Sequence, residues 1–79
     1  MNPDNPTVKV SLGEYRVRTQ FNPSDDSVVQ NIKERMAETL NYINENIKPG
    51  DNGEIARLKS LALTSLEESA MWAVKAATA

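Results

Sequence analysis

Two aromatic side chains near the start of the chain lie beside a pair of arginines. Tyr15 and Phe21 bracket the segment Arg16-Val17-Arg18. An aromatic ring can stack on the apolar face of a nucleobase, and a neighbouring cation can bind the adjacent phosphate. Aromatic side chains on an arm also commonly pack on the protein core. The pattern therefore predicts either a nucleotide contact or a packing role for these two rings.

A further cation, Lys33, follows Ile32 in a segment with helical periodicity. One interpretation makes Lys33 a phosphate-binding cation near the start of that helix, where free backbone N–H groups add donors. Asp25 and Asp26 oppose that contribution, because their carboxylates would repel the same phosphate. The alternative is a solvated lysine at the edge of the apolar seam, with its stem along the interface.

A polar stripe runs along the last third of the chain. Its members, at spacings of three and four residues, are Arg57, Ser60, Thr64 and Glu67. Most such stripes are solvated faces of amphipathic helices. In a symmetric trimer or hexamer, the same stripe would instead line a central cavity.

The composition excludes most catalytic and metal chemistry. The chain has no His and no Cys, which removes the commonest general base, any thiol nucleophile and the usual zinc ligands. Glu67 and Glu68 point in different directions on a helix and so do not form a catalytic carboxylate pair. No glycine-rich loop or nucleophile–base pair is present. We expect no catalytic residue, no metal site, no cofactor and no enzymatic activity.

The charge and the hydropathy of the chain argue against two classes of partner, duplex DNA and membranes. A formal charge of -2 argues against binding to duplex DNA, because such proteins gain most of their affinity from clustered Lys and Arg. No apolar run approaches the ~20 residues that cross a bilayer, and the N-terminus lacks a secretory signal pattern. These features predict a soluble intracellular protein with no membrane contact.

The residues that precede the helices are expected to form an N-terminal arm, residues 1–21. Apolar and polar residues alternate over residues 7–21, interrupted at Gly13-Glu14. This alternation predicts one or two short strands or an extended arm. An isolated hairpin is marginal in water, so the arm should lie against the helices or against another subunit.

The remaining residues, 22–79, are expected to form an antiparallel hairpin of two helices. Asn22-Pro23 predicts a first helix over about 23–47, and Ser27 with Gln30 offers a rival capping box. Its apolar seam comprises Val29, Ile32, Met36, Leu40, Ile43 and Ile47. A turn over 48–53 leads to a second helix over about 54–77, with Asp51 as its cap. The fold class is therefore mainly α.

The second helix carries more apolar surface than one neighbour can cover. Its expected stripe comprises Ile55, Leu58, Ala62, Leu66, Ala70, Ala73 and Ala77. From Ala70 onward the helix is apolar nearly all round, and such helices are normally buried on several sides. A chain this short buries only about 60% of its unfolded surface. We expect a homo-oligomer, with Trp72 as a core or subunit-contact anchor.

Several motifs resemble the helical-hairpin domain of phage anti-CBASS and anti-Thoeris sponge proteins, over roughly residues 15–78. They are Phe21-Asn-Pro-Ser-Asp with Ile32-Lys33, then Ala62-Leu-Thr64 and Ala70-Met-Trp-Ala-Val-Lys-Ala76. The short chain is more similar to the anti-CBASS member. The resemblance implies a homohexamer in the cytoplasm of the infected bacterial host. It further implies sequestration of cyclic oligonucleotide second messengers without cleavage, which blocks antiphage signalling.

The resemblance also implies which residues bind ligand. In the family, an aromatic residue ahead of the first long helix and the lysine of the Ile-Lys pair hold cyclic dinucleotides at subunit contacts. The lysine corresponds to Lys33, and both Tyr15 and Phe21 lie near the place of the aromatic. A second site, for cyclic trinucleotides, is implied around Thr64, with Arg57 as a further candidate.

The implied trinucleotide site departs from the family pattern, because Leu63 stands where many relatives have a basic residue. The polar stripe that carries this site is expected to lie far from the arm. The competing hypothesis is a structural or protein-binding helical hairpin, such as a small adaptor, that binds no nucleotide. Helical periodicity alone fits both classes.

Overall fold

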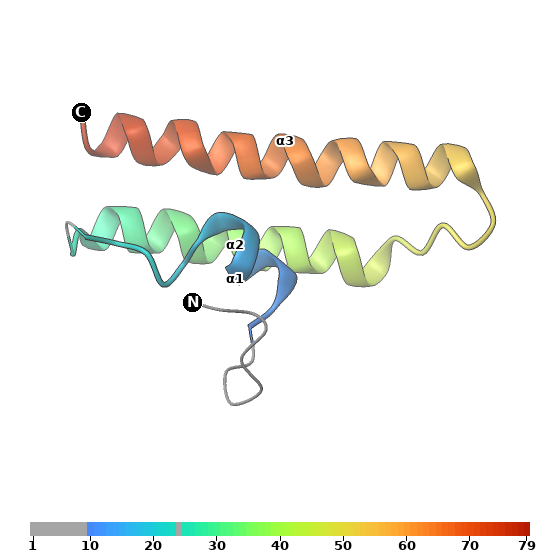
Figure 1. Ribbon diagram of the computed structural model, residues 1–79, viewed down its shortest axis with the longest axis horizontal. Coiled ribbons are helices and arrows are strands. Elements are labelled where there is room, and N and C mark those ends of the chain that lie inside the picture. Colours follow the sequence, from blue (N-terminus) through green and yellow to red (C-terminus); the bar gives the residue numbers. More distant parts are fainter. Residues whose placement is uncertain (1–9, 24) are drawn as a thin grey trace.

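The computed structural model describes residues 10–23 and 25–79, which form three α-helices and no strand. These are α1 (Leu12–Val17), α2 (Ser27–Asn46) and α3 (Gly53–Ala77). The long helices α2 and α3 run antiparallel, and the short α1 packs across α2 (Figure 1). The expected two-helix hairpin is thus confirmed. In the described part of the chain, no helix is long and apolar enough to cross a membrane.

The expected strand is absent from the described residues 10–21, and residues 12–17 form α1 in its place. Ser11 Oγ accepts a hydrogen bond from Glu14 N at 3.1 Å, and Glu14 Oε1 accepts one from Ser11 N at 3.1 Å. This reciprocal capping box satisfies donors at the helix start and favours a helix over an extended segment. Residues 7–9 of the expected strand lie outside the described residues.

The backbone of α1 approaches α2 closely at Gly13. Gly13 N donates to Asn41 Oδ1 at 2.7 Å, and Asn41 Nδ2 donates to Ser11 Oγ at 2.9 Å. A Cβ atom at position 13 would overlap the carbonyl oxygen of Ala37. Only glycine allows this close approach, so Gly13 fixes where α1 sits on the hairpin.

The core lies where the three helices meet. Val17 of α1, Ala37 of α2 and Ala70 of α3 form one buried cluster, and Met36 packs against it. Leu40 of α2 is fully buried. Short side chains at the centre of the cluster let the helices approach one another, and so α1 is part of the core.

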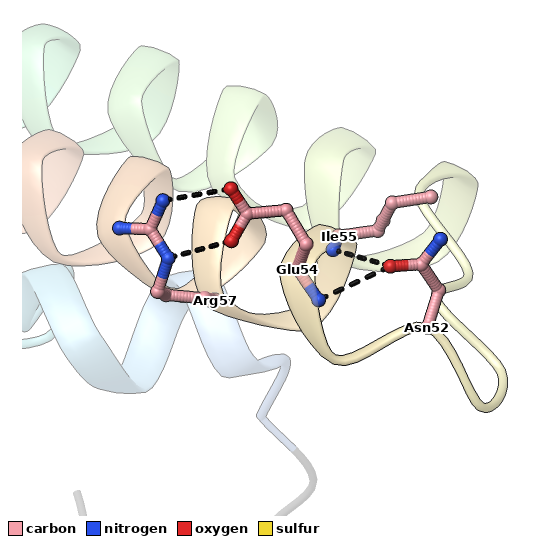
Figure 2. Close-up of polar contacts among 4 residues, drawn as sticks. All are labelled: Asn52, Glu54, Ile55 and Arg57. Atoms are coloured by element: carbon pink, nitrogen blue, oxygen red, sulfur yellow. Dashed lines mark hydrogen bonds and ion pairs between the residues drawn. The ribbon is translucent and has the colours of Figure 1, made fainter.

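Side-chain caps set the starts of both long helices, and in each helix the cap lies further along the chain than the one expected first. The start of α2 is Ser27 rather than residue 23, because Asp26 Oδ1 accepts from Val28 N at 2.8 Å. At α3 the cap is Asn52, one residue beyond the expected Asp51. Its Oδ1 accepts from Glu54 N at 3.1 Å and from Ile55 N at 3.0 Å (Figure 2).

The buried face of α3 is rotated from the expected stripe. Leu63 and Ala70 are buried, whereas Ile55 and Leu58 are at least 40% exposed. The helix has apolar residues on more than one side, so periodicity alone does not decide which side meets α2. The expected stripe is correct at Ala70 and wrong at Ile55 and Leu58.

We expect Gly13→Ala to destabilise the fold by about 1–3 kcal/mol, the usual cost of forcing an extra group into a packed contact. Urea unfolding followed by circular dichroism measures the change. Gly53→Ala is the matched control, because a Cβ at Gly53 meets no atom within 4 Å. Equal stability of the two variants would contradict the close approach of α1 and α2.

Candidate functional site

Of the hollows that adjoin the turn after α1, two are also lined by the aromatic residue Phe21, and each has a volume within the range of about 300–1,000 Å³ that is typical of small-molecule sites. The α1 hollow, of about 410 Å³, is lined by Glu14, Tyr15, Arg18, Gln20 and Phe21. The α3 hollow, of about 420 Å³, lies between the turn and α3. Its lining includes Arg16, Arg18, Phe21, Lys33, Thr64, Glu67, Glu68 and Met71. Arg18 and Phe21 line both hollows.

Lys33 is buried, with 6% of its surface exposed. Its Nζ donates to the carbonyl oxygen of Arg18 at 3.0 Å and to the carbonyl oxygen of Phe21. Burial lowers the pKa of the Lys33 ammonium, while both carbonyl acceptors favour the charged form and oppose this shift. The ammonium therefore fastens the turn 18–21 to α2.

The expectation of a solvated Lys33 at the edge of the seam is wrong. The buried residues of α2 are Val29, Lys33, Ala37 and Leu40, at spacings of four, four and three. These spacings place Lys33 within the inward-facing stripe of the helix. The sequence signal was its position four residues after Val29 and four before Ala37.

Tyr15 and Phe21 are the rings of the site, and neither is buried in the core. Phe21 is 66% exposed, and Lys33 Nζ lies 5.5 Å from its ring centroid. Tyr15 is 37% exposed, and Arg18 Cζ lies 5.3 Å from its ring centroid. Both distances fall in the cation–π range. Packing on the core therefore does not describe Phe21, whereas Tyr15 is covered over most of its surface.

Arg16, another cation of the site, forms an ion pair within the chain. Arg16 Nε lies 2.5 Å from Glu67 Oε1, which ties α1 to α3 across the α3 hollow. The neighbouring carboxylate, Glu68, accepts a hydrogen bond from Trp72 Nε1 at 3.2 Å. The α3 hollow thus contains charges of both signs, and Arg16 is already paired.

Thr64 lines the α3 hollow together with Phe21 and Lys33. The expectation that Thr64 lies far from the arm is therefore wrong. The sequence could not show this, because the turn after α1 and the middle of α3 border one hollow only in the folded chain. Residues separated by more than thirty positions in the sequence thus line one hollow.

Arg57 lies outside both hollows. Its Nε and Nη2 donate to the two carboxylate oxygens of Glu54 at 2.8 and 2.9 Å (Figure 2). The hydrogen bond from Arg57 lowers the pKa of the Glu54 carboxyl. About 10 Å of helix separates position 57 from Thr64 at 1.5 Å per residue. Within one chain, Arg57 does not join the other candidate ligand-binding residues.

The described part of the chain contains no cluster of side chains that could bind a metal ion. Over residues 10–23 and 25–79, no group of three or more His, Cys, Asp or Glu side chains is placed to hold a metal ion. The side chains that line the hollows include aromatic, cationic and hydroxyl groups, together with the carboxylates of Glu14, Glu67 and Glu68. Aromatic, cationic and hydroxyl groups bind bases, phosphates and sugars.

A family model described as Acb2/Tad1, hairpin domain, matches residues 14–78. The matched span contains every residue named above as lining the hollows, together with all of α2 and α3. The curated proteins and the solved structures include no significant match to the chain.

We expect Lys33→Met to lower the free energy of unfolding by at least about 1.5–3 kcal/mol, the cost of losing one hydrogen bond to a charged group. The apolar Met stem can fill the space but leaves the Arg18 and Phe21 carbonyls without their donor. Thermal melting measures the change. Lys48→Met, at an exposed position after α2, is the control and should melt like the parent. A Lys33→Met variant of parental stability would contradict the role of Lys33 in fastening the turn.

Proposed function

Because the chain belongs to the Acb2/Tad1 hairpin domain family, we propose that it binds cyclic dinucleotides and sequesters them without cleaving them. Members of this family are sponges rather than enzymes. Sequestration would withhold the second messengers of CBASS-type antiphage signalling from their effectors. The family match over residues 14–78 is the observation that carries the proposal.

The local chemistry of the hollows supports a nucleotide ligand. Phe21 offers an exposed ring, Tyr15 a partly exposed one, and cations lie within 6 Å of both ring centroids. Base stacking on aromatic side chains is tolerant of base identity. Lys33 contributes by fixing the turn that carries Phe21. Tyr15, Phe21 and Lys33 are thus the proposed dinucleotide residues.

The proposal extends to cyclic trinucleotides through Thr64. Its side chain lines the α3 hollow with Phe21, so a ligand that contacts Thr64 also meets the turn. Arg57 is the further candidate, and its ion pair with Glu54 lies outside the hollows. Arg57 would contribute to such a site only across a contact between two copies of the chain.

Self-association is part of the same proposal. Apolar side chains on α3 are exposed in the single chain: Ile55, Leu58, Leu61, Met71 and Trp72. Apolar residues that gather into a contiguous exposed patch mark an interaction site. We assign the exposed apolar residues of α3 to contacts between copies of the chain, with a hexamer as the favoured assembly.

Incubation with cyclic di-AMP, cyclic di-GMP or cyclic GMP–AMP, followed by desalting and heat denaturation, tests the function directly. We expect chromatography to show intact ligand in proportion to protein, because the chain has no His and no Cys to activate water. A linear product would make the protein an enzyme. Absence of binding to all three nucleotides would favour a structural or protein-binding adaptor.

Phe21→Ala should weaken binding of the retained nucleotide by a factor of about 5–150, the range that corresponds to one stacked base at about 1–3 kcal/mol. Isothermal titration calorimetry measures the dissociation constant. Tyr42→Ala is the matched control, because Tyr42 is an exposed aromatic residue on α2 that lines neither hollow. Equal affinities of the two variants would exclude Phe21 as a stacking residue.

Trp72→Ala tests self-association. Trp72 is 53% exposed in the single chain, so its loss should matter mainly in an assembly. We expect analytical ultracentrifugation to show dissociation at micromolar concentration, with a cost of about 2 kcal/mol or more for a buried contact residue. Val28→Ala, an exposed apolar residue of α2, should leave the assembly intact. A monomeric parent chain would overturn the proposed assembly.

A further inference from the structure

We infer that Arg18 supplies the cation that contacts a phosphate of the cyclic nucleotide, and that Lys33 acts on the ligand as a positioning residue. This inference rests on the proposed function and names the groups that recognise the phosphate at the same site. Arg18 lines both hollows, whereas Arg16 and Lys33 line only the α3 hollow. It is therefore placed to reach a ligand in either one.

The partners of the three cations distinguish them. Arg16 is paired with Glu67 at 2.5 Å, and Lys33 Nζ donates to the carbonyl oxygens of Arg18 and Phe21. Among the described residues, no carboxylate pairs with the Arg18 guanidinium, which lies over the ring of Tyr15. Arg18 thus keeps its hydrogen-bond donors for a bound group. A guanidinium can also bind a phosphate through two parallel hydrogen bonds.

The carboxylates that line the hollows are already hydrogen-bonded. Glu14 Oε1 accepts from Ser11 N, Glu67 from Arg16, and Glu68 from Trp72 Nε1. The pairing of Glu67 with Arg16 reduces its repulsion of a phosphate. In the part of the chain that the structure describes, Arg18 and Lys33 are then the cations of the hollows that no ion pair balances, and the Lys33 ammonium already donates to two backbone carbonyls.

The backbone at Arg18 gives a second, independent observation. Arg18 is the C-cap of α1 and has φ 59° and ψ 53°, in the left-handed region. Glycine is the usual residue at such helix ends, because a side chain there costs conformational energy. A non-glycine residue keeps such a conformation only where the surrounding structure fixes it, and such outliers gather at ligand sites.

The position of the strained residue also explains the role of Lys33. The left-handed turn directs the Arg18 carbonyl to Lys33 Nζ at 3.0 Å. The same ammonium binds the Phe21 carbonyl, so one buried cation fixes the backbone on both sides of Thr19-Gln20. The distance between the backbones of Arg18 and Phe21 is therefore fixed. Arg18 offers a positive charge to a ligand, and Phe21 offers an aromatic ring.

Calorimetry with cyclic di-AMP, cyclic di-GMP and cyclic GMP–AMP, at two salt concentrations, tests the assignment on full-length variants. For whichever nucleotide the parent binds, Arg18→Gln should raise the dissociation constant by about tenfold or more, the value of one charge-assisted hydrogen bond. It should also reduce the salt dependence of binding, because salt screens the contact of an exposed cation. Arg35→Gln is the matched control, since Arg35 is exposed on α2 and lines neither hollow.

Arg18→Gly separates binding from folding. Glycine suits the left-handed conformation, so this variant should melt at or above the parental temperature while binding as weakly as Arg18→Gln. Parental affinity and salt dependence in both Arg18 variants would overturn the assignment and leave the proposed function standing. A parent chain that binds none of the three nucleotides would overturn the proposed function and this assignment with it.

Discussion

The arrangement of the candidate site depends on one buried ammonium group. Lys33 Nζ binds the carbonyl oxygens of Arg18 and Phe21, and it does so from within the apolar face of α2. A buried charge is costly unless polar partners surround it. The turn supplies those partners through its carbonyl oxygens. Because the same hydrogen bonds hold the turn to α2, they also fix its path between α1 and α2. Both hollows are bordered by residues of that turn.

Most of the architecture could be predicted from the sequence, because the long helices are encoded locally. The break at Pro49-Gly50 and the apolar spacing of each segment give a hairpin with a short connection. The helix starts were less predictable, since Asn22, Asp26, Asp51 and Asn52 all have side chains that can cap a helix. Which one caps depends on the path of the preceding turn.

Helix α1 could not be predicted from alternation of apolar and polar residues, because two other signals decided its structure. Ser11 and Glu14 form a capping box, and Gly13 lets the backbone meet α2. The sequence shows which aromatic and cationic residues could form the site, but it does not show which groups each of them contacts. The sequence shows that Lys33 follows Ile32, yet only the fold shows that its charge is used by backbone carbonyls.

The small size of α1 has a dynamic consequence. A helix of six residues has no stability of its own, so it stays folded only while docked on the hairpin. Local opening of such a segment requires less free energy than global unfolding. Each opening would remove the α1 hollow and one wall of the α3 hollow while α2 and α3 remain paired. At the proposed site, ligand binding and docking of α1 would be linked equilibria, and a bound ligand would slow hydrogen exchange at the α1 amides.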